Sequence, residues 1–250
     1  MLDYVRFGKG KKHLVMLPGL STARVKHAAL TLPLMYHKLG KSHTVWVFDK
    51  ADHIPDGYTV RDMARDVANA MDELGIAKAD VFGCSQGGMI AQYLAIDNPE
   101  KVNKLVLAET ASRNNDTIVN VVENWINQVE KDDYKAFAAD MTYKMYSAKY
   151  VSRYKLMIPL MANLLRPKDK TRFINMAKAC LTCNAYDELD KIECPVFVIG
   201  GKEDKVVSPQ ASYEIAQKLG CEIYMYDGLG HAAHEEAPDF NKRVMEFLNR

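Results

Sequence analysis

The chain has 250 residues, of which 48% are hydrophobic and 26% are charged, as is ordinary for a globular protein with one large core. Its formal net charge of +1 and its interspersed acidic and basic residues exclude a strongly basic nucleic-acid-binding surface or a polybasic membrane anchor. No apolar stretch approaches the roughly 18 residues of a membrane-spanning helix, and the N-terminal residues lack the layout of a secretory signal. The five cysteines are an odd number, which favours reduced thiols. We therefore expect a cytoplasmic protein with no nucleic-acid or membrane partner.

Short apolar runs rich in Val, Ile and Phe alternate along the chain with segments of helical periodicity. The runs are Leu2–Phe7, His13–Leu17, Thr44–Phe48, Asp80–Gly83, Lys104–Leu107, Val196–Ile199 and Glu222–Tyr226. Strands that are apolar on both faces are typical of a parallel sheet that helices cover on both sides. The alternation with short connections implies right-handed crossovers. The sequence thus predicts an α/β fold with a doubly wound, mostly parallel sheet.

Periodic apolar residues and capping signals mark the helices between these runs. One segment follows the candidate N-cap Thr59 and ends at Gly75. A second, from Gly87 to Ile96, is largely apolar on all sides, so we expect this helix to be buried.

The pentapeptide Gly83-Cys84-Ser85-Gln86-Gly87 stands between a predicted strand and a predicted helix. A serine between glycines at such a corner has the G-x-S-x-G pattern of a nucleophile elbow. The turn is so sharp that its flanking positions must lack side chains, and the serine takes an unfavourable backbone conformation with its hydroxyl exposed. Only the central position projects outward, so we expect Cys84 to point into the core.

The stretch from Ala111 to Asp190 contains at least three helical patterns and no convincing strand. An unstructured connection of this length is implausible in a compact domain. We therefore predict a core of residues 1–110 and 191–250, with residues 111–190 forming a helical cap over the carboxyl edge of the sheet, where open α/β sheets bind ligands. The cap's large side chains are expected mainly in its own core, with a few facing the active site: Trp125, Tyr143, Tyr146, Tyr150, Tyr154, Met157 and Met161. Cys180 and Cys183 have C-x-x-C spacing but no second pair, which favours packing over metal binding.

A serine nucleophile needs a base and a carboxylate that orients the base, and the chain order serine, acid, histidine is typical of this elbow. Asp204 follows the run Val196–Ile199, and His231 follows the run that ends at Tyr226. Both residues thus lie at carboxyl ends of strands, on the same edge as Ser85. Glu203 and Glu109 are alternatives for the acid, and His234 is the alternative for the base.

These motifs together resemble the α/β-hydrolase family, in its form with a helical cap, over nearly the whole chain. The segment Gly230–Pro238 resembles the family's G-H-x-x-x-x-E-x-P ending, and the segment around Asp204 resembles its acid loop. The resemblance implies a catalytic triad of Ser85, Asp204 and His231. It also implies an oxyanion hole made by the backbone N–H groups of Leu20 and Gln86. The family's usual histidine in the first of these loops is replaced here by Pro18, so the resemblance does not say what organises this loop.

The resemblance further implies a carboxylesterase- or lipase-like serine hydrolase that cleaves an ester-like bond of a small substrate with an apolar acyl or aryl group. No metal and no organic cofactor is implied. The same triad would also serve carbon–carbon bond hydrolysis, thioester cleavage or acyl transfer, because the fold hosts all of these reactions. A ligand receptor with vestigial catalysis is an alternative from another class. The sequence leaves open whether the protein is a monomer or a homodimer.

Overall fold

Seven strands form one sheet in the computed structural model, in the spatial order β1-β3-β2-β4-β5-β6-β7. They are β1 (Tyr4–Phe7), β2 (Lys12–Leu17), β3 (His43–Phe48), β4 (Ala79–Cys84), β5 (Val102–Ala108), β6 (Val196–Gly201) and β7 (Glu222–Tyr226). The edge strand β1 is antiparallel to β3, and all other neighbours are parallel. The predicted strands and the mostly parallel sheet are therefore confirmed. The structure describes residues 1–250 apart from the side chains of residues 159 and 161.

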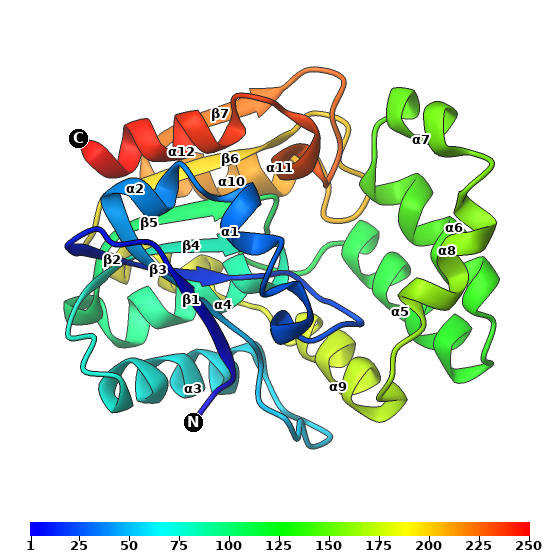
Figure 1. Cartoon of the computed structure of the whole chain (residues 1–250), viewed down its shortest axis with the longest axis horizontal. Coiled ribbons are helices and arrows are strands. Elements are labelled where there is room, and N and C mark those ends of the chain that lie inside the picture. The colour runs from blue at the N-terminus through cyan, green and yellow to red at the C-terminus, as the bar shows by residue number, and fades with distance from the viewer.

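Helices cover both faces of this sheet (Figure 1). One face packs against α3 (Val60–Glu73), α4 (Gln86–Asp97) and α10 (Pro209–Leu219), and the other against α2 (Leu39–Ser42) and α12 (Phe240–Asn249). Shorter helical turns are η1 (Val25–Ala28), α1 (Leu32–Met35), η2 (Pro99–Lys101), η3 (Tyr186–Lys191) and α11 (Ala233–Glu236). Successive strand residues point to opposite faces, and accordingly Leu105 and Leu107 join one apolar cluster while Val106 and Ala108 join the other. Two buried faces explain why the strands are continuously apolar.

Between β5 and β6 the described chain forms five α-helices and then η3, and the helices α5 to α8 lie to one side of the sheet in Figure 1. The five α-helices are α5 (Asp116–Glu130), α6 (Tyr134–Met145), α7 (Ala148–Tyr154), α8 (Ile158–Leu165) and α9 (Lys170–Cys180). The expected helical patterns are present, and a proline in the first turn of α8 is consistent with a separate helix beginning at Ile158. The start and the end of this insertion meet in a single antiparallel bridge between Arg113 and Asn184. The division into a core and a cap at residues 111–190 stays a prediction.

Polar side chains fasten the inserted helices to the sheet. From α9, Asn175 donates a hydrogen bond of 2.8 Å to the carbonyl of Ile54. Ahead of α7, the backbone N–H of Ser147 donates to Glu236 over 2.9 Å and its hydroxyl donates to the same carboxylate over 2.5 Å. Both attachments lie on the side of the sheet where the strands' carboxyl ends emerge. Within the described part of the chain, no helix combines the length and the apolar character needed to cross a bilayer.

Candidate active site

Ser85 occupies the sharp turn between β4 and α4, with φ 52° and ψ −121°. A positive φ is costly for a residue with a Cβ and persists only where the surroundings hold it. Two hydrogen bonds do so here: Ser85 N–H donates to the carbonyl of Ala108 over 2.9 Å, and the hydroxyl of Thr110 donates to the Ser85 carbonyl over 2.7 Å. Both partners come from β5 and its end, so the neighbouring strand fixes the turn.

The glycine at position 87 is required by the close approach of another strand. A Cβ on Gly87 would lie 1.9 Å from the carbonyl oxygen of Leu17, at the end of β2. Any side chain there would force the first turn of α4 away from the sheet. This contact is the steric reason for the second glycine of the G-x-S-x-G motif.

The three side chains implied as a triad lie within hydrogen-bonding distance of one another. His231 Nε2 is 2.9 Å from the hydroxyl oxygen of Ser85, and His231 Nδ1 is 2.8 Å from Asp204 Oδ2. The other carboxylate oxygen of Asp204 accepts hydrogen bonds from the backbone N–H groups of Val206 and Val207, at 2.8 and 3.0 Å. Asp204 thus accepts a hydrogen bond from the N–H at Nδ1, and Nε2 is left as an acceptor for the serine hydroxyl.

Two loops at the carboxyl edge bring the acid and the imidazole together. The backbone N–H of Glu203 donates to the carbonyl of Leu229 over 2.9 Å, which joins the loop after β6 to the loop after β7. A Cβ on Gly201 would lie 2.2 Å from the same carbonyl oxygen, so the close contact depends on glycine. Glu203 itself, the alternative acid, is exposed to solvent.

The loop after β2 lies directly against the serine. A Cβ on Gly19 would lie 3.2 Å from Cβ of Ser85, and Leu20 lines the same cavity as Ser85. Gln86 is the first residue of α4, where backbone N–H groups have no partner within the helix. Among the hydrogen bonds of the described residues, the backbone N–H groups of Leu20 and Gln86 donate none. Both groups are thus free to donate to a ligand.

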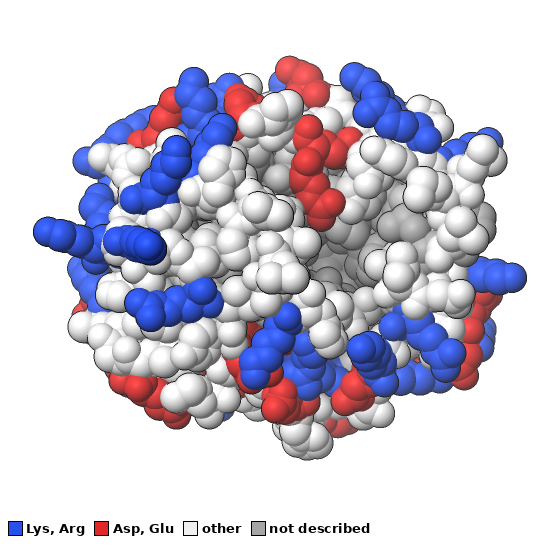
Figure 2. All heavy atoms as spheres, in the orientation of Figure 1, with Lys and Arg blue, Asp and Glu red and all other residues white. Residues whose placement is uncertain are grey.

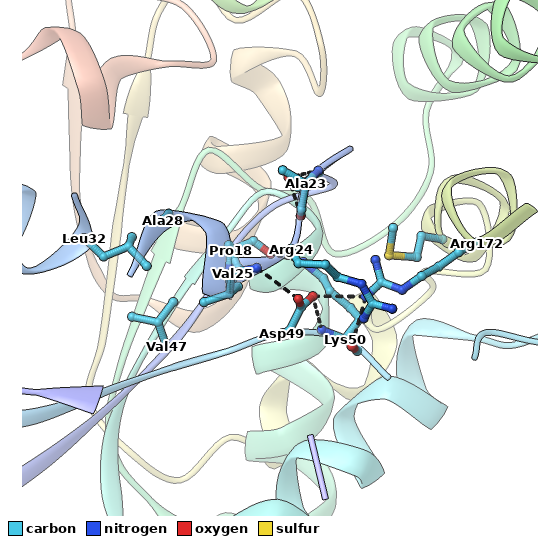
Figure 3. Close-up of a pocket in the computed structure, with 12 residues that line it drawn as sticks. Pro18, Ala23, Arg24, Val25, Ala28, Leu32, Val47, Asp49, Lys50 and Arg172 are labelled. Atoms are coloured by element: carbon cyan, nitrogen blue, oxygen red, sulfur yellow. Dashed lines mark hydrogen bonds and ion pairs between the residues drawn. The ribbon is translucent and has the colours of Figure 1, made fainter. Parts of the chain in front are cut away.

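Lys50, which no motif in the sequence indicates, holds this loop in place. Its ammonium group donates hydrogen bonds of 2.5 and 2.6 Å to the carbonyl oxygens of Pro18 and Gly19. Burial lowers the pKa of Lys50 to about 8, an effect that Asp49 opposes and Arg172 reinforces. Figure 3 shows Arg172 reaching from α9 toward Asp49 and Lys50, and its guanidinium lies 3.0 Å from the Asp49 carboxylate. The position of Asp49 and Lys50 after β3, at the carboxyl edge, is the signal that could have identified them.

A cavity of about 180 Å³ opens beside Ser85 under the inserted helices. Its apolar wall comes from Trp125, Met141 and Met145, and its acidic side chain is Glu235. Of the other cap residues singled out in the sequence, Tyr143 and Met157 are exposed, and the side chain of Met161 lies outside the described residues. Figure 2 shows a hollow to the right of centre on this face, beside the inserted helices that Figure 1 places on the right. Charged side chains of both signs lie mainly around the edge of the face.

The alternative acid and base, Glu109 and His234, pair with each other beside the sulfur of Cys84. His234 Nδ1 is 3.1 Å from Glu109 Oε2, and the Cys84 thiol donates to the same oxygen over 3.3 Å. As the turn geometry predicts, Cys84 is buried. Burial raises the pKa of the Cys84 thiol to about 11. The pKa of His234 lies well above its usual value, because the neighbouring Cys84 and Glu109 outweigh the opposing effect of burial.

Comparison with known proteins places these features in a family. Residues 12–238 match a family model described as the alpha/beta hydrolase fold. "Putative carbamate hydrolase RutD" of Caulobacter segnis is 27% identical over 198 residues, covering 78% of this chain and 74% of that protein. The "2-hydroxy-6-oxononadienedioate/2-hydroxy-6-oxononatrienedioate hydrolase" of Burkholderia vietnamiensis is 29% identical over 200 residues, covering 75% and 68%. The structure of the enol-lactonase from Burkholderia xenovorans LB400 aligns with a TM-score of 0.85 at 24% identity, covering 100% of this chain and 96% of that one.

Proposed function

Since the chain belongs to the alpha/beta hydrolase family, we propose that it is a serine hydrolase that cleaves an ester-like bond of a small molecule. The observation that carries this proposal is the hydrogen-bonded series from Ser85 through His231 to Asp204, at 2.9 and 2.8 Å. It joins a strained, partly exposed hydroxyl to a base and to an orienting carboxylate, which is what activation of a serine requires.

The reaction proceeds in two halves. His231 Nε2 takes the hydroxyl proton as Ser85 Oγ attacks the carbonyl carbon, and the N–H groups of Leu20 and Gln86 bind the negative oxygen of the tetrahedral intermediate. His231 then gives the proton to the leaving oxygen, and an acyl-enzyme forms. His231 then deprotonates a water that attacks the acyl carbon, and it returns this proton to Ser85 Oγ as the bond between Oγ and the acyl carbon breaks and the acid leaves. Asp204 stays ionised throughout and stabilises the imidazolium.

Lys50 acts in this scheme as a positioning residue for the oxyanion hole. In a trans peptide the carbonyl oxygen and the following N–H point in opposite directions. Because Lys50 fixes the Gly19 carbonyl, it also fixes the direction of the Leu20 N–H, which points the opposite way. The cation takes over the organising role that the family's histidine, replaced here by Pro18, would have in this loop.

The lining of the cavity favours a neutral substrate. Trp125, Met141 and Met145 suit an apolar acyl or aryl group, and flexible methionines adapt to irregular shapes. The described residues that line this cavity include Glu235 but no Lys or Arg, so a substrate carboxylate would lack a lysine or arginine partner there. A neutral ester or carbamate therefore fits better than the dicarboxylate in the name of the Burkholderia vietnamiensis relative. Carbon–carbon bond hydrolysis is the second candidate, which that relative's name supports.

The first test is hydrolysis of p-nitrophenyl acetate and butyrate by the wild-type protein and by Ser85→Ala. We expect release of p-nitrophenol that Ser85→Ala abolishes, and covalent labelling of Ser85 by a fluorophosphonate. Wild-type-like turnover by Ser85→Ala would refute the assignment. A folded protein whose serine resists the probe would instead support a receptor.

A panel of substrates decides the reaction. Neutral oxygen esters, carbamates, thioesters and vinylogous diketones are compared under one condition. A higher kcat/KM for the diketones than for the esters would replace ester cleavage by carbon–carbon bond hydrolysis.

A further inference from the structure

Three potential metal ligands from three different elements meet behind the nucleophile elbow. Cys84 ends β4, Glu109 follows β5, and His234 lies in α11. Cys84 Sγ is 3.3 Å from Glu109 Oε2 and 3.8 Å from His234 Nδ1, and these last two atoms are 3.1 Å apart. One thiolate, one imidazole and one carboxylate are ligands that zinc accepts.

The spacing of these atoms matches tetrahedral coordination. Zinc bonds of about 2.3 Å to sulfur and about 2.0–2.1 Å to nitrogen and oxygen, at tetrahedral angles, separate the ligand atoms by about 3.3–3.6 Å. The distances of 3.1, 3.3 and 3.8 Å lie around that range. An ion placed over the centre of the triangle would therefore reach all three atoms with shifts of a few tenths of an ångström.

Neighbouring groups contact the outer atoms of Glu109 and His234, as the groups around a metal site contact its ligands. Glu109 Oε1 accepts the backbone N–H of His234 at 3.0 Å, which leaves Oε2 for the ion. The other ring nitrogen of His234, Nε2, lies 3.6 Å from Glu235 Oε1. This distance is longer than a hydrogen bond, so Glu235 would have to move by about half an ångström to accept the second N–H, as an acceptor almost always does for a metal-bound histidine.

Charge and access also favour a divalent cation. Glu109 is 0% exposed and Cys84 is 7% exposed, so the carboxylate, and the thiolate that forms when a metal binds, need a compensating charge close by. A doubly charged ion balances one thiolate and one carboxylate, and its binding releases the thiol proton and the proton on Nδ1. Cys84 and His234 line the cavity beside Ser85 and also a second cavity of about 80 Å³, which has room for water as a fourth ligand.

From this geometry we propose that Cys84, Glu109 and His234 bind a divalent transition-metal ion, Zn²⁺ above all, at a site separate from the Ser85–His231–Asp204 series. Neither Cys84 nor Glu109 takes part in the ester cleavage described above. The proposal therefore stands whether or not the protein hydrolyses esters.

The test uses the full chain, freed of metal with a chelator and titrated with Co²⁺ as a spectroscopic substitute for Zn²⁺. We expect one equivalent to bind, with a thiolate-to-cobalt charge-transfer band in the near ultraviolet that Zn²⁺ then removes. Cys84→Ala should abolish the band. Glu109→Gln and His234→Gln should weaken Zn²⁺ binding by more than the roughly 100-fold that loss of an outer-shell partner costs.

Three of the four other cysteines, none of which belongs to this cluster, supply the controls. Cys183 is buried, and Cys194 and Cys221 are partly buried, so Cys183→Ala and the double variant Cys194→Ala/Cys221→Ala should keep the stoichiometry and the band. His234→Gln removes a partly exposed side chain and tests the site even where Cys84→Ala does not fold. Absence of stoichiometric binding to the folded wild-type protein, or a band that persists in Cys84→Ala, would overturn the proposal.

Discussion

Two sets of side chains meet at one turn of the chain, and they are nearly identical in composition. The first set has a hydroxyl, an imidazole and a carboxylate, from Ser85, His231 and Asp204. The second has a thiol, an imidazole and a carboxylate, from Cys84, His234 and Glu109. In the first set the two partners contact opposite nitrogens of the imidazole ring, so Nε2 can take the proton of Ser85 while Asp204 holds the N–H at Nδ1. In the second set both partners approach the same nitrogen, Nδ1.

The direction from which the partners approach the imidazole, more than the residue types, decides the chemistry of each set. An imidazole between two partners can take a proton from one while the other holds its orientation. Three atoms that converge on a single point cannot pass a proton in this way, but they can surround an ion. The turn creates the difference because Ser85 points toward the cavity while Cys84, one residue earlier, points into the core.

Replacing each of the two histidines in turn by glutamine is the strongest test of this comparison. We expect His231→Gln to lower kcat for p-nitrophenyl acetate by on the order of 10⁵- to 10⁶-fold, because the serine loses its base. His234→Gln should lower it by less than about tenfold, since its ring does not contact the serine. The measurement uses metal-free protein whose circular dichroism spectrum matches that of the wild type. Comparable losses of kcat in both variants would show that the two sets of side chains do not differ in function.

Asp204→Asn should give the next largest effect on turnover. Asp204→Asn keeps the shape of the side chain and an oxygen for the N–H groups of Val206 and Val207, but it favours the wrong tautomer of His231. We expect a fall in kcat of about 10⁴-fold, equivalent to about 5 kcal/mol, with little change in KM. A loss below about 100-fold would mean that another carboxylate orients His231.

For Glu109→Gln we expect lower stability as the main consequence. The carboxylate is fully buried and accepts three hydrogen bonds, from the His234 backbone, its ring and the Cys84 thiol. Removing one partner of a buried charged pair typically costs about 3–5 kcal/mol. Urea unfolding of the two proteins should show this difference, whereas an unchanged midpoint would indicate that His234 is uncharged in the folded state.

Lys50 lies behind the loop that borders both cavities, and its removal should have a smaller effect. We expect Lys50→Met to lower kcat by about 10- to 100-fold with KM nearly unchanged, less than the 10²–10³-fold for complete loss of an oxyanion-hole donor. A rise in KM with kcat preserved would point to a role in substrate binding instead. Thermal unfolding of Lys50→Met provides the check on its fold.

The pH dependence of Lys50 should give the smallest effect. Burial lowers its pKa from 10.5 to about 8, so the ammonium loses its proton as the pH rises through that value. The neutral amine still donates to the Pro18 and Gly19 carbonyls, but through weaker bonds. We expect kcat to fall by less than about tenfold above pH 8 in the wild-type protein, and Lys50→Met should lack this step.

The sequence predicts much of this arrangement because its strongest signals are local. The apolar runs and the elbow mark the sheet, and Ser85, Asp204 and His231 follow strands whose carboxyl ends share one edge. The antiparallel pairing of β1 is not predictable in this way, because a short apolar edge strand carries no sign of its direction. Glu109 and His234 stand in the sequence as rivals of Asp204 and His231, and only three-dimensional packing pairs them with each other. The role of Lys50 depends on a long side chain that reaches a neighbouring loop, which no spacing along the chain reports.

The bridge between Arg113 and Asn184 has a practical consequence for engineering. Everything between these two residues leaves the sheet and returns to it at one point, so a shorter turn or the helices of another relative could be spliced in there without stretching the backbone. A chimaera of this kind must still contain α9, because Arg172 of that helix neutralises the buried Asp49. Grafts that keep α9 and exchange only the helices before it are therefore the natural starting library for changing substrate preference.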